Sequence, residues 1–419
     1  MHILHVVQLY HPVPTGAGRY FAEIGTRLVR EGRRVTVLAT DAYDLEHLWA
    51  AGRRRIPESH DIHGGVAITR LPIQRMPGSQ IAYPALRRLM AELQRLPGSG
   101  GLLRRLARLT PRWPGVQAWL AQQHATAPFD LIHTTNITLD FAILPAYDFA
   151  RRHGIPFLCT PFVHLGVAGD SSVVRYYTMR HQIELLCNSD RVLTMTGLER
   201  THLAARGVPE ERLRRVGVGI DPAELTGGNA ERFRAEQQIS GPLVLYIGAL
   251  ARDKGAIDTI EALRQLWRSG RQVNLVLIGA PLAHFEAYYA ELSPAEQAHI
   301  RLLRYASDAV KCDALAAADL FVMPSRTDSF GIVYLEAWSY GVPVVGAQAG
   351  GVPDVVADGH DGLLVPYGVP TVLAQAVARL LDDATLRQRL GAAGQAKMLH
   401  EYTWEHVFAR VQDVYQEVV

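Results

Sequence analysis

The sequence predicts two α/β domains, each a doubly wound parallel sheet covered by helices, and three observations support this fold class. Strand-like apolar runs alternate with amphipathic helical stretches along almost the whole chain. Several runs, such as PLVLYIG and DLFVMP, are apolar on both faces, as expected for parallel strands between two layers of helices. The segment 219–233, which holds Pro222 and the Gly227–Gly228 pair, separates two series of such runs.

The domain boundaries follow from these series of strands. We expect a first Rossmann-like domain at 1–222 and a second at 223–400, and 419 residues suffice for two packed cores. The predicted strands lie at 2–9, 33–40, 129–135, 155–162, 190–196, 242–248, 273–279, 319–324 and 342–347. Two doubly wound sheets place a ligand crevice at the carboxyl ends of their strands.

Composition excludes several classes of function. A net charge of +2 gives no support for a nucleic-acid partner. The three cysteines are far apart and lack metal-ligand or redox spacing, so we expect buried thiols in a reducing compartment. The first residues lack the basic region of a signal peptide, and no apolar run approaches the roughly 20 residues needed to span a bilayer. These features predict a soluble, cytoplasmic protein.

The segment 84–120 interrupts the alternation of strands and helices. It contains two basic helical stretches separated by PGSGG, the first with an apolar stripe and the second with leucines beside several arginines. The stripe of the first stretch comprises Leu86, Leu89, Met90, Leu93 and Leu96. We expect a helical hairpin that packs on the first domain and has a solvated basic face. Peripheral contact with the inner face of a membrane is the alternative.

The stretch SRTDSFGIVYLEAWSYGVPVV, at 325–345, is the strongest candidate for a site. It predicts a strand end, a loop with Asp328, a helix that begins at Phe330–Gly331, and Glu336 within that helix. A helix N-terminus with a glycine suits a phosphate, and a carboxylate on either side suits hydroxyl groups. A ligand with a phosphate and two sets of hydroxyls is a nucleotide sugar.

Two further loops contain candidate phosphate-binding groups. Gly16 and Gly18 follow the first strand, although Phe21 stands where a dinucleotide fingerprint has its third glycine. A dinucleotide site with Asp41 as the ribose-binding acid stays open, as do tight-turn glycines without a ligand. In the second domain, Gly248 ends a strand, and the loop that follows it carries two cations that could hold a diphosphate without a metal, Arg252 and Lys254.

The chain resembles a family 4 glycosyltransferase of the GT-B fold, two Rossmann-like domains that face each other across a cleft. The likeness rests on seven motifs in order: PTGAGRYFAEI, TPFVHLG, GALARDKG, LVLIGAP, DSFGIVYLEAWSYGVPVV, GGVPDVVADGHDGLLVP and YTWEHVFARVQDVY. It implies a retaining hexosyl- or related transferase that takes a sugar from a UDP- or GDP-sugar co-substrate, without metal or other cofactor. It also implies that the segment 401–419 forms a helix that crosses back to the first domain.

The resemblance implies a role for individual residues. Asp328 and the following amides would hold the sugar and phosphate, and Glu336 would hold the ribose. Lys254 would neutralise the leaving diphosphate, and His164 would contact the transferred sugar. The expected catalytic residues are His164, Arg252, Lys254, Asp328 and Glu336. The expected donor-binding residues are Gly16, Gly18, Gly248, Arg252, Lys254, Gly279, Leu303, Tyr305, Asp328, Ser329, Phe330, Gly331, Ile332, Val333 and Glu336.

Four residues depart from the family pattern: Thr15 replaces a glycine, Ala249 an arginine, Asp328 a glutamate and Arg304 a glycine. Because Ala249 leaves the phosphate loop one guanidinium short, the loop either binds phosphate more weakly or regains the missing charge from Arg252. The acceptor, a glycan, lipid or small molecule, has no recognisable signal. Two alternatives stay open: another GT-B enzyme, such as a nucleotide-sugar epimerase or a phosphorylase, and a sugar-nucleotide-binding module without turnover.

Overall fold

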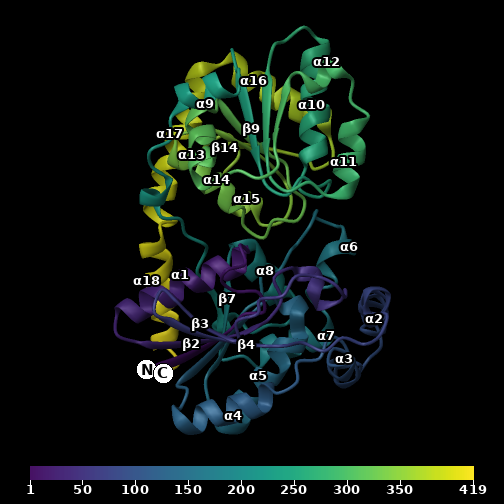
Figure 1. Ribbon diagram of the computed structural model, residues 1–419, viewed down its shortest axis with the longest axis vertical. Helices are drawn as coiled ribbons and strands as arrows, with labels where there is room; N and C mark the ends of the chain where they lie inside the picture. Colours follow the sequence, from purple (N-terminus) through teal and green to yellow (C-terminus); the bar gives the residue numbers. More distant parts are fainter. The chain divides into compact units, whose positions relative to one another are not determined.

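The computed structural model describes all 419 residues, which form two compact units (Figure 1). Unit 1 comprises 1–163, 172–216 and 408–419, and unit 2 comprises 164–171 and 217–407. The predicted fold class, two parallel-sheet α/β domains, is confirmed. The chain passes from one unit to the other four times, so neither unit is a single stretch of sequence.

Unit 1 is built on an eight-stranded sheet with the order β3-β4-β2-β1-β5-β6-β7-β8, parallel except for the β3–β4 pair. Its strands are β1 (His2–Val6), β2 (Arg34–Thr40), β3 (His60–His63), β4 (Val66–Leu71), β5 (Leu131–Thr135), β6 (Phe157–Thr160), β7 (Arg191–Thr194) and β8 (Leu213–Arg215). The helices up to residue 216 are α1 (Gly16–Arg30), η1 (Leu45–Leu48), α2 (Ser79–Leu93), α3 (Gly100–Leu106), α4 (Val116–Thr126), η2 (Ile137–Leu139), α5 (Asp140–His153), α6 (Ser171–Val174), α7 (Arg180–Cys187), α8 (Gly197–Ala205) and η3 (Glu210–Arg212).

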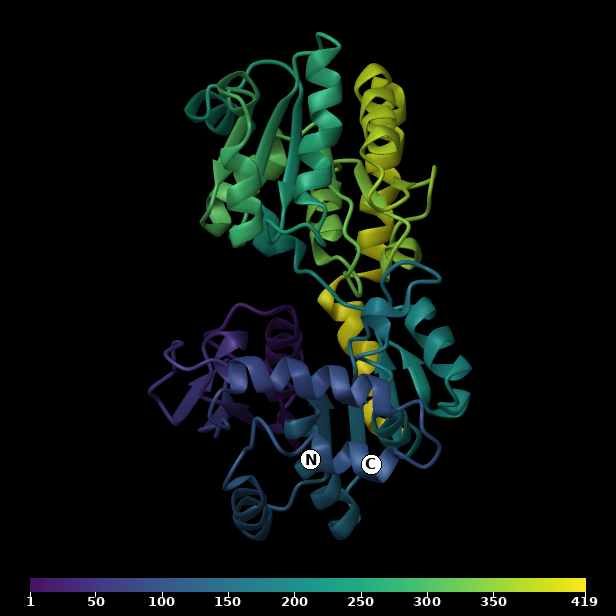
Figure 2. The same cartoon turned by 90° about the vertical axis from the view of Figure 1, so that its right-hand side faces the viewer.

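Unit 2 has a six-stranded, wholly parallel sheet with the order β11-β10-β9-β12-β13-β14, covered by helices on both faces (Figure 2). Its strands are β9 (Leu243–Ile247), β10 (Asn274–Ile278), β11 (Ile300–Leu303), β12 (Leu320–Met323), β13 (Val344–Ala347) and β14 (Gly362–Val365). The remaining helices are η4 (Pro222–Leu225), α9 (Ala230–Glu236), α10 (Ala256–Arg268), α11 (Ala283–Ala290), α12 (Pro294–Gln297), α13 (Asp308–Ala317), α14 (Ile332–Ser339), α15 (Val352–Val355), α16 (Pro370–Asp382), α17 (Ala384–Glu401) and α18 (Trp404–Gln416).

The central strands form the two cores. Every residue of β1, β5, β9 and β12 is buried, as the doubly apolar sequences of β9 and β12 predict for strands between two helical layers. The β3 and β4 strands at the edge of unit 1 instead alternate between exposed and less exposed residues, because one of their faces meets solvent.

The segment 219–233, predicted as a linker, packs on unit 2. A Cβ atom at Gly228 would lie 2.3 Å from the carbonyl oxygen of Cys312, so only glycine fits this approach. The backbone N–H of Asn229 donates to Asp313 Oδ1 at 2.7 Å. The main stretch of unit 2 therefore begins at Gly217, before the predicted boundary after residue 222, because η4 and α9 are anchored to α13.

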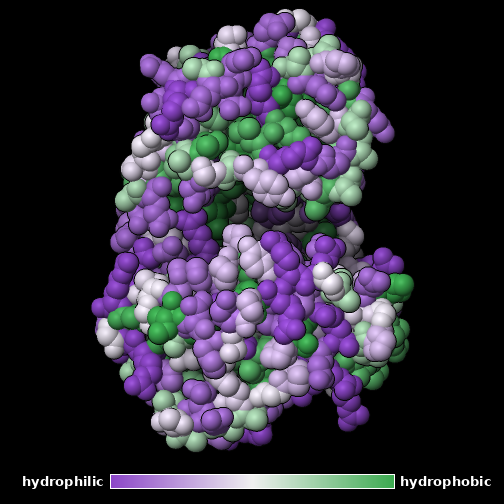
Figure 3. Space-filling view, in the orientation of Figure 1, coloured by the Kyte–Doolittle hydropathy of each residue, from purple (hydrophilic) through white to green (hydrophobic).

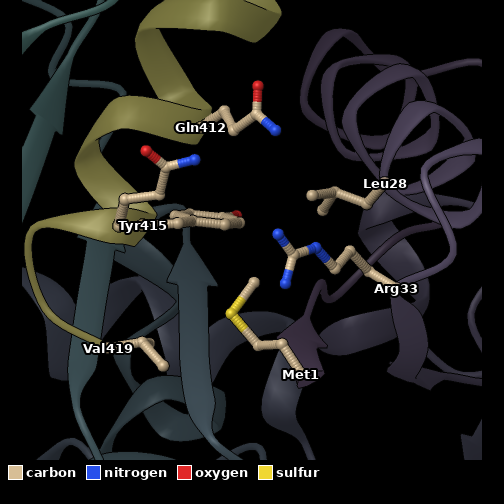
Figure 4. A pocket seen from close by; sticks show the side chains of 7 residues that line it. Met1, Leu28, Arg33, Gln412, Tyr415 and Val419 are labelled. Atoms are coloured by element: carbon tan, nitrogen blue, oxygen red, sulfur yellow. The ribbon is translucent and has the colours of Figure 1, made fainter.

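The end of the chain completes the core of unit 1. The Tyr415 hydroxyl is hydrogen-bonded to His5 Nε2 at 3.0 Å and to His133 Nδ1 at 2.6 Å. Burial lowers the pKa of His5 to about 3 and that of His133 as well, so both imidazoles are neutral. Tyr415 also lines a cavity of about 210 Å³, into which Arg33 and Gln412 point, close to both chain termini (Figure 4).

The segment 84–120 packs on unit 1, as expected for the helical hairpin. Arg87 in α2 is buried and donates to Asp140 Oδ2 at 2.7 Å, and Arg104 in α3 pairs with Asp148 at 2.7 Å. The expected apolar stripe is divided, however, because Met90 is buried while Leu89 and Leu96 are 51% and 56% exposed. No helix in the structure has both the length and the apolar character required to cross a bilayer.

The hydroxyl of Tyr415 should contribute measurably to stability. In Tyr415→Phe, imidazole nitrogens of His5 and His133 lose their shared partner, which should lower the free energy of unfolding by about 2 kcal/mol. Urea denaturation at pH 7 measures this loss. Tyr10→Phe is the matched control, because Tyr10 is 1% exposed and its hydroxyl has no hydrogen-bond partner. Equal losses in the two variants would contradict the role of the shared hydroxyl.

Candidate functional site

Two loops of unit 2 meet at the carboxyl edge of its sheet. They follow the neighbouring strands β9 and β12 and span residues 248–255 and 324–331. Arg326 N donates to the Asp253 carbonyl oxygen at 2.8 Å, and Thr327 Oγ1 donates to Asp253 Oδ2 at 3.0 Å. A Cβ atom at Gly255, where φ is +80°, would lie 2.4 Å from the Pro324 carbonyl oxygen. The two loops are thus held in direct contact.

This contact brings together two of the predicted residues, Lys254 and Asp328. Lys254 Nζ lies 3.0 Å from Asp328 Oδ1. Asp328 Oδ2 is also buried but has no hydrogen-bond partner, so it is an acceptor turned away from bulk water. Burial, the largest influence, would raise the pKa of Asp328, but the Lys254 ammonium, the Ser325 side chain and His164 together hold the pKa below its ordinary value. The Asp328 carboxylate is therefore ionised at neutral pH.

His164 lies beside this pair. It belongs to the segment 164–171, which packs with unit 2 rather than with unit 1. The Gly350 N–H donates to the Gly166 carbonyl oxygen at 2.7 Å, and Asp170 forms an ion pair with Arg326. Burial and the nearby positive charge of Lys254 lower the pKa of His164 to about 4. The imidazole is consequently neutral at pH 7.

The loop after β12 ends at the N-terminus of α14, as predicted. Gly331 adopts a φ of +91°, and a Cβ atom there would lie 2.4 Å from the ring of Tyr334. Tyr334 in turn donates from its hydroxyl to the Met323 carbonyl oxygen at 2.5 Å. The N–H groups of Ile332 and Val333 lie in the first turn, where no preceding turn supplies an acceptor. This geometry suits an anion near Ser329–Val333.

Glu336 lies within α14 and is only 4% exposed. Lys311 in α13 donates from Nζ to Glu336 Oε1 at 3.0 Å. The sequence analysis did not identify Lys311, because the two residues are 25 positions apart on separate helices. The usable signal was the single lysine of α13.

The ends of β10 and β11 contribute the next group of predicted residues. A Cβ atom at Gly279 would lie 1.9 Å from the carbonyl oxygen of Gly248, so the loop after β9 and the end of β10 touch through their backbones. Gly279 N donates to the Leu303 carbonyl oxygen at 3.0 Å. Tyr305, two residues later, is 90% exposed. Gly248, Gly279 and Leu303 therefore lie together, and Tyr305 points into solvent.

Arg252 differs from Lys254 in its surroundings. It is exposed, and its backbone N–H donates to His284 Nε2 at 2.9 Å. Burial raises the pKa of Asp258, and the positive charge of the Arg252 guanidinium lowers it. The same guanidinium is not among the charges that shift the pKa of Asp328. Arg304, another departure from the family pattern, forms an ion pair with Glu286 in α11.

The first-domain candidates, Gly16 and Gly18, lie at the N-terminus of α1 in unit 1. Thr15 Oγ1 accepts a hydrogen bond from Gly18 N at 3.0 Å, so Thr15 is the N-cap of this helix. Gly16 is exposed, and a Cβ atom at this position would touch nothing. Asp41 is buried and accepts a hydrogen bond from Arg55 Nε at 2.6 Å, so one of its carboxylate oxygens is already occupied.

Two family models match adjoining parts of the chain. The model of the glycosyl transferase 4-like domain matches residues 15–219, and the model of the glycosyl transferases group 1 matches residues 229–397. The second match contains the two loops and both acids described above. Together the two matches extend over nearly all of the sequence.

Known proteins resemble all or part of the chain. A D-inositol 3-phosphate glycosyltransferase of Xylanimonas cellulosilytica is 27% identical over 96% of this chain and 91% of its own length. A GDP-mannose-dependent monoacylated alpha-(1-6)-phosphatidylinositol monomannoside mannosyltransferase of Corynebacterium glutamicum is 30% identical over 47% of this chain and 54% of its own length. The structure of Anabaena HepE in complex with UDP superimposes with a TM-score of 0.74 at 18% identity, with all of both chains covered. The chain belongs to the group 1 glycosyl transferases and is a glycosyltransferase of the GT-B fold.

Proposed function

We propose that the protein transfers a sugar from a nucleotide-diphosphate sugar to an acceptor hydroxyl, with retention of anomeric configuration and without a metal ion. The observation that carries this proposal is the Lys254–Asp328 pair at 3.0 Å, beside neutral His164 and the N-terminus of α14. A diphosphate needs positive charge, and a sugar needs hydrogen-bond acceptors. The edge of the unit 2 sheet offers both within one pair of loops.

The donor phosphates would be held by Lys254 and by the first-turn N–H groups of α14. As the bond between the anomeric carbon and the phosphate oxygen breaks, negative charge grows on the departing diphosphate, and Lys254 stabilises it. The unpartnered Oδ2 of Asp328 would accept a hydrogen bond from a sugar hydroxyl. The acceptor oxygen then bonds to the anomeric carbon, and its proton passes to the departing diphosphate.

A UDP- or GDP-sugar is the donor that the comparisons favour. HepE was solved with UDP, and the mannosyltransferase of Corynebacterium glutamicum is named as GDP-mannose-dependent. The same mannosyltransferase is named for a phosphatidylinositol mannoside acceptor, and the relative from Xylanimonas cellulosilytica for an inositol phosphate. We therefore place a lipid-linked glycan or a small polyol phosphate first among the acceptors.

Product analysis tests the proposed reaction directly. The protein is incubated with UDP- and GDP-sugars and a panel of acceptors, and free nucleotide diphosphate is measured. NMR of the product then gives the anomeric configuration, and an α-donor should yield an α-linked product. Lys254→Ala serves as the inactive control. A β-linked product would contradict retention, and donor binding without release of diphosphate in any acceptor mixture would favour a binding module.

The carboxylate of Glu336 should be required for donor binding. If it holds the ribose hydroxyls, Glu336→Gln should weaken donor affinity in calorimetry by about 1.5–3 kcal/mol, as for hydrogen bonds to a charged group. Asp361→Asn is the matched control, because Asp361 is also buried and lies 3.0 Å from a lysine, Lys397. Both variants should lose stability, but only the first should lose donor affinity. Unchanged affinity in Glu336→Gln would remove this residue from the site.

Arg252 should replace the guanidinium that Ala249 does not supply. The side chain is exposed and long enough to turn toward the diphosphate, so Arg252→Ala should lower kcat by roughly ten- to a thousandfold. Donor affinity should change little, because the charge it meets grows in the transition state. Ala249→Arg in that background should restore part of the rate. Arg268→Ala, at a similarly exposed arginine in α10, is the control, and a normal kcat in Arg252→Ala would exclude the role.

Activity should survive removal of divalent metal ions. Lys254 and the N-terminus of α14 supply positive charge where a metal would otherwise neutralise the diphosphate. The rate measured after treatment with EDTA should therefore match that of untreated protein. Complete loss of activity that manganese or magnesium restores would contradict this prediction.

A further inference from the structure

The segment 75–112 in unit 1 has a charge that the rest of the chain does not share. Its eight arginines and one acidic residue, Glu92, give a net charge of +7, whereas the whole chain has +2, so all other residues together carry −5. The arginines are Arg75, Arg87, Arg88, Arg95, Arg104, Arg105, Arg108 and Arg112. Positive charge is thus concentrated on α2, α3 and their flanking loops.

The same segment contains a concentration of exposed apolar side chains. Six of the fourteen exposed large hydrophobic residues of the chain lie between positions 76 and 109. They are Met76 (44% exposed), Ile81 (76%), Leu89 (51%), Leu96 (56%), Leu102 (49%) and Leu109 (37%). Single exposed leucines are ordinary on a protein surface, but a group of this size on α2, α3 and their flanking loops marks an interaction surface.

The exposed residues share one face of each helix. In α2, Arg88 and Leu89 follow Ile81 by seven and eight residues. Both spacings are about two helical turns, so the three side chains lie on one side of the helix. Met90 and Ala91 of the same helix are buried against unit 1. Arg87 is anchored on that inner side by Asp140, so the helix cannot rotate its leucines inward without losing this buried pair.

The short helix α3 and the turn after it repeat this arrangement. Leu102, Arg105 and Leu109 recur at intervals of three and four residues and are exposed, whereas Leu103 is buried. Figure 1 shows α2 and α3 at one edge of unit 1, where the two helices contact each other. Green, apolar side chains gather over this edge at the lower right of Figure 3. No ion pair involves Arg88 or Arg105, so their charges are free to meet a partner.

We propose that this surface, the α2–α3 face formed by Ile81, Arg88, Leu89, Leu102, Arg105 and Leu109, docks onto a bilayer that contains anionic phospholipid. Arginines would meet the headgroup phosphates while the leucines enter the boundary between headgroups and acyl chains. A second copy of the chain fits less well, because two faces of the same positive charge would repel each other. A nucleic acid also fits less well, because it would leave the exposed aliphatic side chains between the arginines without an apolar partner.

Vesicle flotation tests this proposal with the intact chain. Wild-type protein should float with vesicles of phosphatidylcholine that contain phosphatidylglycerol, should remain unbound with phosphatidylcholine alone, and should detach as salt is raised. Arg88→Gln with Arg105→Gln should weaken binding about 25-fold, because one arginine at an anionic surface contributes about fivefold. Leu89→Gln with Leu102→Gln should weaken it by about tenfold or more.

The controls use residues of equal exposure elsewhere in the chain. Leu399→Gln is matched to the leucine variant, because Leu399 and Leu102 are both 49% exposed. Arg200→Gln with Arg206→Gln, both in or next to α8 and exposed, is matched to the arginine variant. Equal binding to neutral and anionic vesicles, or no binding to either, would overturn the proposal. So would a dimer in sedimentation that the leucine variant dissociates, since the face would then join two copies.

Discussion

The architecture of unit 2 depends on close contact between backbones at one edge of its sheet. Parallel strands all end at the same edge, and glycines there allow the following loops to touch without side chains between them. Gly255 lies against Pro324, Gly279 against Gly248, and Gly350 against Asp328, with Cβ positions 2.4, 1.9 and 2.2 Å from carbonyl oxygens. Lys254 reaches Asp328 because these loops have no space between them. The ion pair is a consequence of backbone packing.

Much of this arrangement could be predicted from the sequence, because it follows local rules. A doubly apolar run marks a central strand, and a loop after such a run lies at the functional edge, so Lys254 and Asp328 were both expected there. Lys311 was not predicted, because its partner Glu336 lies on a separate helix. The segment 164–171 escaped prediction for a similar reason. Its place in unit 2 depends on the hydrogen bond between Gly350 and Gly166 and the ion pair between Asp170 and Arg326.

The segment 84–120 shows a limit of helical periodicity. Periodicity groups leucines into a stripe but does not say which side of the helix meets the protein. In α2 that side is decided by Arg87, whose charge is buried beside Asp140. Burial alone would raise the pKa of Asp140, but Arg87 and His181 hold it below its ordinary value. A buried arginine contradicts the usual rule that arginines face water, so the predicted apolar stripe coincides only in part with the buried side of the helix.

The chain order of unit 1 has a consequence for its synthesis. His5 in β1 and His133 in β5 are made early, yet their shared partner, Tyr415, belongs to the last twelve residues of the chain. The hydrogen-bond partner of His5 and His133 is therefore synthesised only after all of unit 2. Unit 2 can close its sheet first, because β9 to β14 are contiguous. The sheet of unit 2 is therefore fully synthesised before unit 1 has its full set of core residues.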